Sequence, residues 1–325
     1  MAEIIAEAEA LERAAELILA GQPVAMPTET VYGLAADATS GEAVARIFEA
    51  KGRPRFNPLI VHVSDMDMAE RIGAFDPLSR RLADAFWPGP LTLVVPLRPD
   101  GGVHPLVSAG LDTVGLRMPK GFAATVIART GRPLAAPSAN SSGRISATSA
   151  GAVEADLGAR IALIVDGGPT PVGLESTIVK VEDGRARLLR PGGVAADEIE
   201  RVAGAPLLRN HGATTIEAPG MLASHYAPRA AVRLDATLVG AGEALLAFGP
   251  ERIAGADGAV AVANLSPTGD LREAAANLFS HLAALDRAGA TAIAVEPIPM
   301  EGLGEAINDR LARAAAPRGG VARAP

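Results

Sequence analysis

Polar side chains that could bind a small charged ligand come directly after a short apolar run near the start of this sequence. The run 23–26 is followed by Pro27, Thr28, Glu29 and Thr30. We expect a buried strand to end at the proline, because proline has no N–H to donate to a strand ladder. Small hydroxyl groups at the end of a strand can hydrogen-bond a polar ligand. The threonines could equally cap a helix, and this stretch alone leaves both readings open.

Three cations lie close together a little further along the chain. Lys51, Arg53 and Arg55 are separated by glycine and proline, which break a helix, and Asn57 lies beside them. Such cations repel one another unless an anion binds between them. Arginine offers a planar fork that matches phosphate or carboxylate, whereas lysine offers a mobile point charge. The stretch predicts an anion site, with a solvated basic loop as the alternative.

Two more arginines stand at the ends of apolar runs. Arg117 precedes Met118 and a proline, and Arg190 is followed directly by a proline. An arginine at the end of a buried strand can reach a ligand over the edge of the sheet. Each arginine could instead pair with a neighbouring carboxylate, and the sequence does not decide between the two.

Hydroxyl and amide side chains follow other apolar runs. Ser138 and Asn140 lie in a turn led by proline, and Ser176 follows Glu175. They suit hydrogen bonds to ribose or phosphate oxygens, and they would also suit helix caps. His62 lies within an apolar run, where a histidine is more often a hydrogen-bonded core residue than a catalytic one.

Several common catalytic signatures are missing from the sequence. It has no phosphate loop, no dinucleotide fingerprint, no H-E-x-x-H and no G-x-S-x-G motif. With no cysteine and only five histidines, a structural zinc site is not expected. Cations from three segments and hydroxyls from four suit an anionic, polar ligand and catalysis by positioning and charge neutralisation. Phosphoryl or nucleotidyl transfer from ATP has these requirements.

The composition narrows the class of protein. A length of 325 residues suggests about two domains, and 49% hydrophobic residues allow a sizeable core. The net charge of −7 argues against stable nucleic-acid binding over the whole surface. We expect a cytoplasmic protein, because cysteine, a secretion signal and a membrane-spanning apolar run are all absent.

Apolar runs and amphipathic stretches alternate along the chain, which indicates an α/β protein. Residues 3–20 have apolar side chains at helical spacing, so we expect a helix there. Two apolar runs on either side of 183–184 predict a hairpin, and the antiparallel pair would make the sheet mixed. We expect domains at 1–208 and 230–325, joined by an ordered linker at 209–229.

Taken together, the polar stretches resemble the threonylcarbamoyl-AMP synthase family, in its long form with a YrdC-like catalytic domain and an added C-terminal domain. The matching segments, in the family's order, are Pro27–Leu34, Lys51–Pro54 with Asn57–Leu59, Trp87–Thr92, Arg117–Pro119, Ala136–Asn140, Glu175–Val179 and Leu189–Gly192. They cover most of residues 10–205, and the linker around His225 and Tyr226 is similar to the long form's interdomain segment. The resemblance implies a YrdC-like twisted mixed sheet with helices and a smaller C-terminal α/β domain of Rossmann-like form.

The family joins L-threonine, bicarbonate and ATP into threonylcarbamoyl-adenylate and pyrophosphate, and a separate complex transfers the carbamoyl group to a tRNA adenosine. The resemblance implies that Lys51 and Arg53 are catalytic. By the same resemblance, the residues that would hold threonine are Thr30, His62, Arg117, Ala136 and Ser176. Those that would hold ATP are Lys51, Arg53, Asn57, Thr113, Ser138, Ser146, Arg190 and Tyr226. Mg²⁺ is expected to arrive with ATP, through phosphates and water rather than a protein site.

Two other functions are compatible with parts of this pattern. An RNA-binding or regulatory module could keep the fold without the synthesis, although the acidic balance and the retained ligand-facing motifs argue against it. A carbamoyl-transfer module of hydrogenase maturation shares this domain type but would be expected to carry zinc-finger cysteines. The linker could close over the nucleotide with Tyr226 or could only dock the second domain, and both readings stay open.

Overall fold

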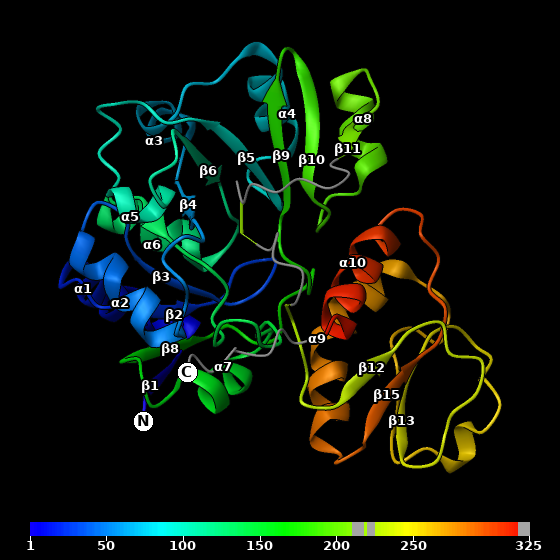
Figure 1. The fold of residues 1–325 in the computed structure, drawn as a ribbon. Helices are drawn as coiled ribbons and strands as arrows, with labels where there is room; N and C mark the ends of the chain where they lie inside the picture. Colours follow the sequence, from blue (N-terminus) through cyan, green and yellow to red (C-terminus); the bar gives the residue numbers. More distant parts are fainter. Residues whose placement is uncertain (210–217, 220–224, 318–325) are drawn as a thin grey trace, which may run out of the picture. The chain divides into compact units, whose positions relative to one another are not determined.

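The computed structural model describes residues 1–209, 218–219 and 225–317, which form two compact units (Figure 1). The first unit contains the described residues of 1–142 and 146–219. The second contains 143–145 and the described residues from 225 onward. The short segment 143–145 therefore belongs to the second unit, although the chain on both sides of it belongs to the first.

A large mixed sheet forms the first unit. Within the described residues its eleven strands, in spatial order, are β1 (Glu3–Ala6), β8 (Leu163–Asp166), β2 (Val24–Met26), β3 (Gly33–Asp37), β7 (Leu134–Ala135), β4 (Ile60–His62), β6 (Thr113–Arg117), β5 (Leu91–Pro96), β9 (Thr177–Glu182), β10 (Arg185–Arg190) and β11 (Leu208–Arg209). Its α-helices are α1 (Leu11–Leu19), α2 (Gly41–Lys51), α3 (Met66–Ile72), α4 (Pro77–Phe86), α5 (Pro105–Ser108), α6 (Phe122–Thr130), α7 (Ala150–Leu157) and α8 (Ala196–Ala203). The hairpin β9–β10 is antiparallel, whereas β5 and β9 are parallel, so the prediction of a mixed sheet is confirmed.

A side-chain cap and a glycine explain where α2, the helix before the cationic stretch, begins and ends. The Ser40 hydroxyl accepts a hydrogen bond from the N–H of Ala43 at 3.3 Å and starts α2. Gly52 ends it in the left-handed region, at φ +59°, which glycine adopts without strain. Lys51 is therefore the last helical residue, and Arg53 follows after a sharp turn.

The prediction of a helix over 3–20 is wrong at its first turn. Glu3–Ala6 is the strand β1, which pairs in parallel with β8, and a short 3₁₀ turn at Glu7–Glu9 precedes α1. The apolar spacing of these first residues fits either structure. Pairing with the edge of the sheet decides for a strand, because it satisfies backbone groups that water would otherwise have to bind.

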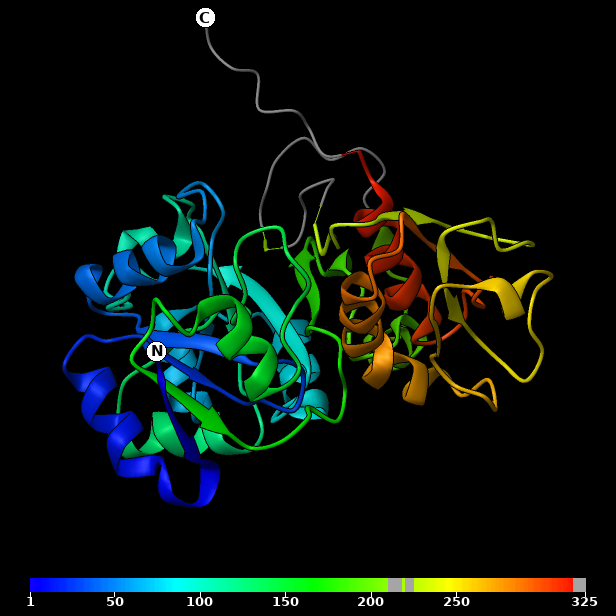
Figure 2. The same ribbon diagram turned by 90° about the horizontal axis from the view of Figure 1, so that it is seen from below.

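The second unit contains a smaller parallel sheet. Among the described residues its strands, in spatial order, are β12 (Ala231–Arg233), β15 (Ala292–Val295), β13 (Glu243–Ala247) and β14 (Val262–Asn264), and its α-helices are α9 (Leu271–Arg287) and α10 (Gly304–Ala315). The two helices lie side by side, as Figures 1 and 2 show. The Asp270 carboxylate caps α9 by accepting from the N–H of Arg272 at 2.6 Å. The strand pairings among the described residues of this sheet are parallel, which agrees with the predicted α/β unit.

None of the helices in the described ranges is long and apolar enough to cross a membrane.

Candidate functional site

Neighbouring strand ends of the first unit bring several of the predicted site residues together. β4 and β6 are parallel neighbours, and their register sets His62 opposite Arg117. Gly33 at the start of β3 forms a bridge with Ser138. Segments from distant parts of the chain thus meet at one region of the sheet, as the parallel arrangement of strand ends would require.

Lys51 is buried at the end of α2, with 2% of its surface exposed. Its Nζ donates a hydrogen bond to the carbonyl oxygen of Ser138 at 2.6 Å and another to that of Asn140. The Lys51 carbonyl accepts from the N–H of Ser142 at 2.8 Å, so this residue fixes the turn 138–142 at two places. Burial, and next to it the positive charge of Arg53, hold the pKa of Lys51 well below its usual value. An anion placed beside Nζ would relieve both effects.

Arg53 and Asn57 shape the other side of the cationic stretch. Arg53 Nη2 donates to the carbonyl oxygen of Pro58 at 2.8 Å, and its Nε donates to that of Asn57 at 3.3 Å. Asn57 Oδ1 is buried and has no hydrogen-bond partner within the described part of the chain. Such an acceptor is costly unless a donor reaches it, and a ligand N–H or O–H would serve.

Thr113, predicted to contact ATP, lines a small cavity close to this stretch. The cavity measures about 10 Å³, about enough for one water molecule, and Pro58, Ser108 and Pro219 also line it. Thr113 is half-buried at the first position of β6.

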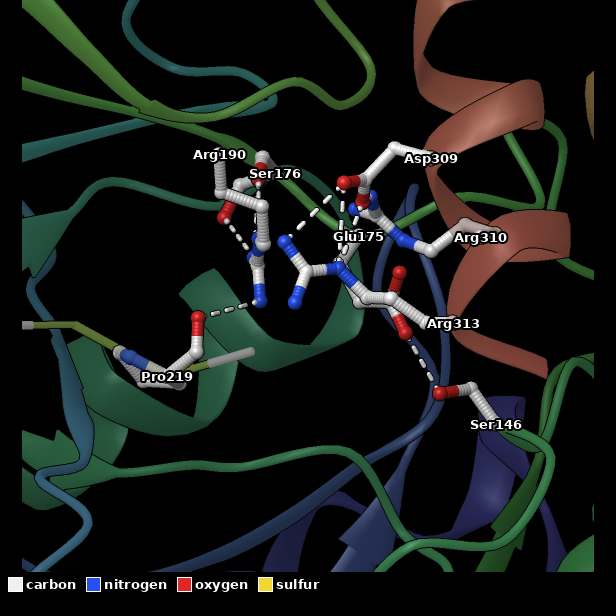
Figure 3. A network of polar contacts seen from close by, with 8 residues as sticks. All are labelled: Ser146, Glu175, Ser176, Arg190, Pro219, Asp309, Arg310 and Arg313. Atoms are coloured by element: carbon white, nitrogen blue, oxygen red, sulfur yellow. Dashed lines mark hydrogen bonds and ion pairs between the residues drawn. The ribbon is translucent and has the colours of Figure 1, made fainter. Parts of the chain in front are cut away.

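Arg190 and Ser176 form a hydrogen-bonded pair at the ends of β10 and β9. Arg190 Nη2 donates to the Ser176 carbonyl at 2.8 Å, and Nη1 donates to that of Pro219 at 3.2 Å (Figure 3). The Ser176 hydroxyl lies 2.7 Å from that of Thr92. A Cβ on Gly192 would lie only 2.4 Å from the carbonyl oxygen of Glu175, so only glycine fits this close approach.

Ser146, also predicted to contact ATP, donates its hydroxyl to Glu175 Oε1 at 2.5 Å (Figure 3). Both residues are buried. This hydrogen bond joins the chain that follows the Ala136–Asn140 segment to the segment that carries Ser176.

The threonines after β2 do not cap a helix, because the chain passes directly into β3. Thr28 donates its hydroxyl to the Val31 carbonyl at 2.7 Å, and the hydroxyls of Thr28 and Thr30 lie 2.8 Å apart. Thr30 has no exposed surface. Ala136, whose backbone is predicted to lie near threonine, donates its N–H to the Ile60 carbonyl at 3.0 Å.

Arg117 pairs with a carboxylate that the sequence reading did not assign to the site. Arg117 Nη2 lies 2.8 Å from Glu29 Oε2, an ion pair whose angles fall short of those of a hydrogen bond. The Arg117 Nε donates to the Gly89 carbonyl at 3.2 Å, so the segment that begins at Trp87 also orients this arginine. Glu29 lies next to Thr30 within the family-matching segment Pro27–Leu34, and this position was the available signal for it.

His62 is buried in β4, with 4% of its surface exposed. Burial, and in addition the positive charge of Arg117, hold the pKa of His62 well below its usual value. The imidazole is therefore neutral at pH 7, and it can hydrogen-bond a ligand without adding charge.

Tyr226, predicted to contact the nucleotide, packs within the second unit. Its ring stacks on Phe279 with 5.4 Å between centroids, and the guanidinium of Arg310 lies 5.2 Å from the ring centre. Arg310 is in turn paired with Asp309 (Figure 3). The Ala227 N–H donates to the Gly143 carbonyl at 3.0 Å. Much of the predicted linker, residues 210–217 and 220–224, lies outside the described residues, and the nucleotide contact of Tyr226 stays a prediction.

Comparison with known proteins identifies the family. A family model described as "Telomere recombination" matches residues 16–192, and a second, "Threonylcarbamoyl-AMP synthase, C-terminal domain", matches residues 194–316. The chain belongs to the threonylcarbamoyl-AMP synthase family. It is 41% identical to the threonylcarbamoyl-AMP synthase of Bacillus subtilis over 95% of this chain and 93% of that protein. It is 41% identical to that of Pyrococcus abyssi over 93% and 92%.

Solved structures agree with this assignment to the threonylcarbamoyl-AMP synthase family. The crystal structure of P. abyssi Sua5 complexed with L-threonine matches with a TM-score of 0.86 and 39% identity, over 97% of this chain and 96% of that one. Escherichia coli YciO matches 59% of the chain with a TM-score of 0.52 and 18% identity, which shows a shared fold alone. The expected YrdC-like sheet with a second α/β domain is thereby confirmed.

Proposed function

We propose that this protein forms threonylcarbamoyl-AMP and pyrophosphate from L-threonine, bicarbonate and ATP. The observation that carries the proposal is the 41% identity to a threonylcarbamoyl-AMP synthase over 95% of the chain. The related P. abyssi protein was crystallised with L-threonine, which supports threonine as the amino acid. We place the catalytic domain at 1–208, the linker at 209–229 and the C-terminal domain at 230–325.

The ATP side of the site is built on buried cations. Lys51 and Arg53 would neutralise the phosphates, and they are the residues to which we assign catalytic roles. The burial of Lys51 and its depressed pKa support this role, because a bound anion would stabilise the charged form of this buried ammonium group. The other proposed ATP contacts are Asn57, Thr113, Ser138, Ser146, Arg190 and Tyr226.

The threonine side is built on Arg117 and neutral groups. Arg117 would bind the carboxylate, and the proposed partners for the rest of the amino acid are Thr30, His62, Ala136 and Ser176. A neutral His62 supports this arrangement, since it can hydrogen-bond the substrate without adding a second positive charge beside Arg117.

The reaction balances in two steps. The α-ammonium group of threonine first loses a proton to solvent, the resulting amine attacks the carbon of bicarbonate, and loss of water gives the N-carboxylate. An oxygen of this carboxylate then attacks the α-phosphorus of ATP, and the bond to pyrophosphate breaks. Neutralisation of phosphate charge by Lys51 and Arg53 would favour the second step, because negative charge accumulates on the departing pyrophosphate.

Mg²⁺ would accompany ATP and help to neutralise the phosphates. In the described ranges no three His, Cys, Asp or Glu side chains are grouped as metal ligands. With nucleotides Mg²⁺ usually binds through phosphate oxygens and water, and we propose the same mode here. Lys51 and Arg53 would then contact phosphate oxygens that the ion leaves open.

The product is a mixed anhydride that water can hydrolyse, so an acyl-acceptor reaction must consume it. We propose that a separate tRNA threonylcarbamoyl-transferase complex takes it up in the cytoplasm. The net charge of −7 argues against stable binding of the tRNA by this chain itself.

Pyrophosphate release tests the proposed function. ATP should yield pyrophosphate only when threonine and bicarbonate are both present. Equal ATP turnover without threonine would contradict the proposal. The same assay separates the synthase from an RNA-binding or regulatory module, which would release no pyrophosphate.

A further inference from the structure

Glu29 and Arg117 form a buried ion pair at the proposed threonine site. Their side chains are 10% and 4% exposed, and Glu29 Oε2 lies 2.8 Å from Arg117 Nη2. Glu29 Oε2 also accepts the N–H of Lys120 at 3.1 Å, which holds one of its two oxygens in place. The backbone carbonyl of Glu29 accepts from the N–H of Val172 at 3.0 Å, so the residue is fixed at both ends.

Within the residues that the structure describes, each member of the pair has a buried atom that makes no hydrogen bond. In the described part of the chain, Glu29 Oε1 has no donor and Arg117 Nη2 has no acceptor with hydrogen-bond geometry. A carboxylate oxygen and a guanidinium nitrogen are strong hydrogen-bonding groups, and burying them unsatisfied is costly. Glu29 Oε1 needs a donor, and Arg117 Nη2, which contacts Glu29 Oε2 outside hydrogen-bond geometry, can still donate to an acceptor. A ligand that carries both a donor and an acceptor would satisfy the pair.

Charge balance points to the same kind of ligand. The pair has no net charge, because Arg117 is already neutralised by Glu29. A carboxylate arriving alone would add a negative charge beside Glu29 in a buried place, where like charges repel strongly. A ligand with its own cation next to its carboxylate would leave the cluster neutral, and an α-amino acid is such a zwitterion.

We propose that Glu29 binds the α-ammonium group of the amino-acid substrate while Arg117 binds its carboxylate. The inference rests on the proposed function, because it assigns a further contact within the threonine site. It makes Glu29 a specificity-determining residue, which selects amino acids over hydroxy acids and other carboxylates. Thr30, the next residue along the chain, then lies close to the same end of the substrate.

The test compares two ligands and two variants. L-Threonine and (R)-3-hydroxybutyrate differ only by the α-ammonium group. Glu29→Gln keeps the shape of the side chain and removes its charge. Binding of each ligand is measured by calorimetry in the presence of ATP, and ATP affinity and thermal unfolding show whether the variant is folded. Glu12→Gln, which removes the carboxylate of an exposed pair with Arg129, is the matched control.

The expected result is that Glu29→Gln changes the affinities for the two ligands in opposite directions. Glu29→Gln should weaken threonine binding about tenfold to a hundredfold, the effect of one lost charge-assisted hydrogen bond. The same variant should bind (R)-3-hydroxybutyrate more tightly than the original protein does, because the repelling carboxylate is gone. Glu12→Gln should change neither.

Equal weakening of both ligands would overturn the proposal and make Glu29 only a support for Arg117. No change in either would overturn it too. If Glu29→Gln does not fold, Glu29→Asp serves instead: it keeps the charge but shortens the reach, and unchanged preference for threonine would overturn the proposal. Failure of the original protein to bind threonine would contradict the proposed function itself, a distinct outcome.

Discussion

Two cations of the first unit, Lys51 and Arg117, are almost equally buried but are partnered differently. Lys51 donates to the backbone carbonyls of Ser138 and Asn140, whereas Arg117 is paired with the carboxylate of Glu29. Carbonyl oxygens orient a cation without cancelling its charge, and a carboxylate cancels it. The difference indicates that Lys51 suits a ligand with net negative charge, such as phosphate, and that Arg117 suits one with charges of both signs.

The largest effect is expected at Lys51. Lys51→Ala should lose about 1.5–3 kcal/mol of ATP binding or turnover, because one charge-assisted contact is removed. Arg53→Ala should have an effect of similar size. The measurement is kcat/KM for ATP from pyrophosphate release, with thermal unfolding to show that the variants fold.

The exposed Lys120 provides the control for this prediction, because Lys120→Ala removes a lysine side chain outside the cluster. Normal ATP affinity and rate in both Lys51→Ala and Arg53→Ala would contradict the account of the phosphate side.

Gly192→Ala should break the Arg190 and Ser176 arrangement by sterics. The added Cβ would lie 2.4 Å from the Glu175 carbonyl oxygen and 2.5 Å from the Ser176 carbonyl carbon, and the clash should cost about 1–3 kcal/mol of stability. Gly151→Ala in α7 is the control, because no described atom outside its chain neighbours and its own helix backbone lies within 4 Å of its added Cβ. Denaturant unfolding of both variants measures the difference. Equal stability of the two would show that this region adjusts freely.

Valine offered as a substrate in place of threonine tests how the proposed threonine site recognises the substrate hydroxyl. The hydroxyls of Thr30 and Ser176 already lie within hydrogen-bonding distance of Thr28 and Thr92, so valine would leave neither without a partner. The types of Thr30 and Ser176 alone predict strong rejection of valine. Because both hydroxyls are already partnered, we expect instead a modest discrimination of about 1–2 kcal/mol, the value of a hydrogen bond that is lost but replaced. Competition between the two amino acids in product formation measures it. A preference for threonine over valine above about a thousandfold, or about 4 kcal/mol, would mean that the hydroxyls of Thr30 and Ser176 need the substrate hydroxyl as a hydrogen-bond partner.

The smallest expected effect is the uptake of protons by the protein when ATP binds. Since the pKa of Lys51 is depressed and a phosphate would raise it, ATP binding should take up a fraction of a proton at a pH between the two pKa values. ATP affinity should fall as the pH rises through this window. Calorimetry in buffers of different ionisation enthalpy measures the uptake, and Lys51→Met should abolish it. Uptake that persists unchanged in Lys51→Met would assign the proton to another group.

Much of the fold follows from local sequence patterns. The apolar runs at 91–95 and 292–295 and the break at Asp183–Gly184 predict β5, β15 and the β9–β10 hairpin, because length and turn residues decide these elements locally. Residues 3–6 could not be predicted in this way. Their strand depends on pairing with β8, about 160 residues along the chain, and local spacing carries no information about that partner.

The candidate site, like the fold, could be predicted from the sequence only in part. The motifs identify Lys51, Arg117 and Ser176 as candidates, since their types and positions at strand ends are visible in the sequence. Which carboxylate neutralises Arg117 depends on how the turn before β3 folds against β6, and the sequence left that pairing open. Glu29 was visible within its segment, but only the geometry of the pair assigns it a contact.

The most direct test of the account is the identity of the product. The protein is incubated with ATP, L-threonine and ¹³C-bicarbonate, and the nucleotide product is analysed by mass spectrometry alongside pyrophosphate. The account predicts threonylcarbamoyl-AMP that carries one ¹³C in its carbamoyl group, in an amount equal to the pyrophosphate released. A threonyl-AMP without label, or pyrophosphate formed without any labelled nucleotide, would contradict it.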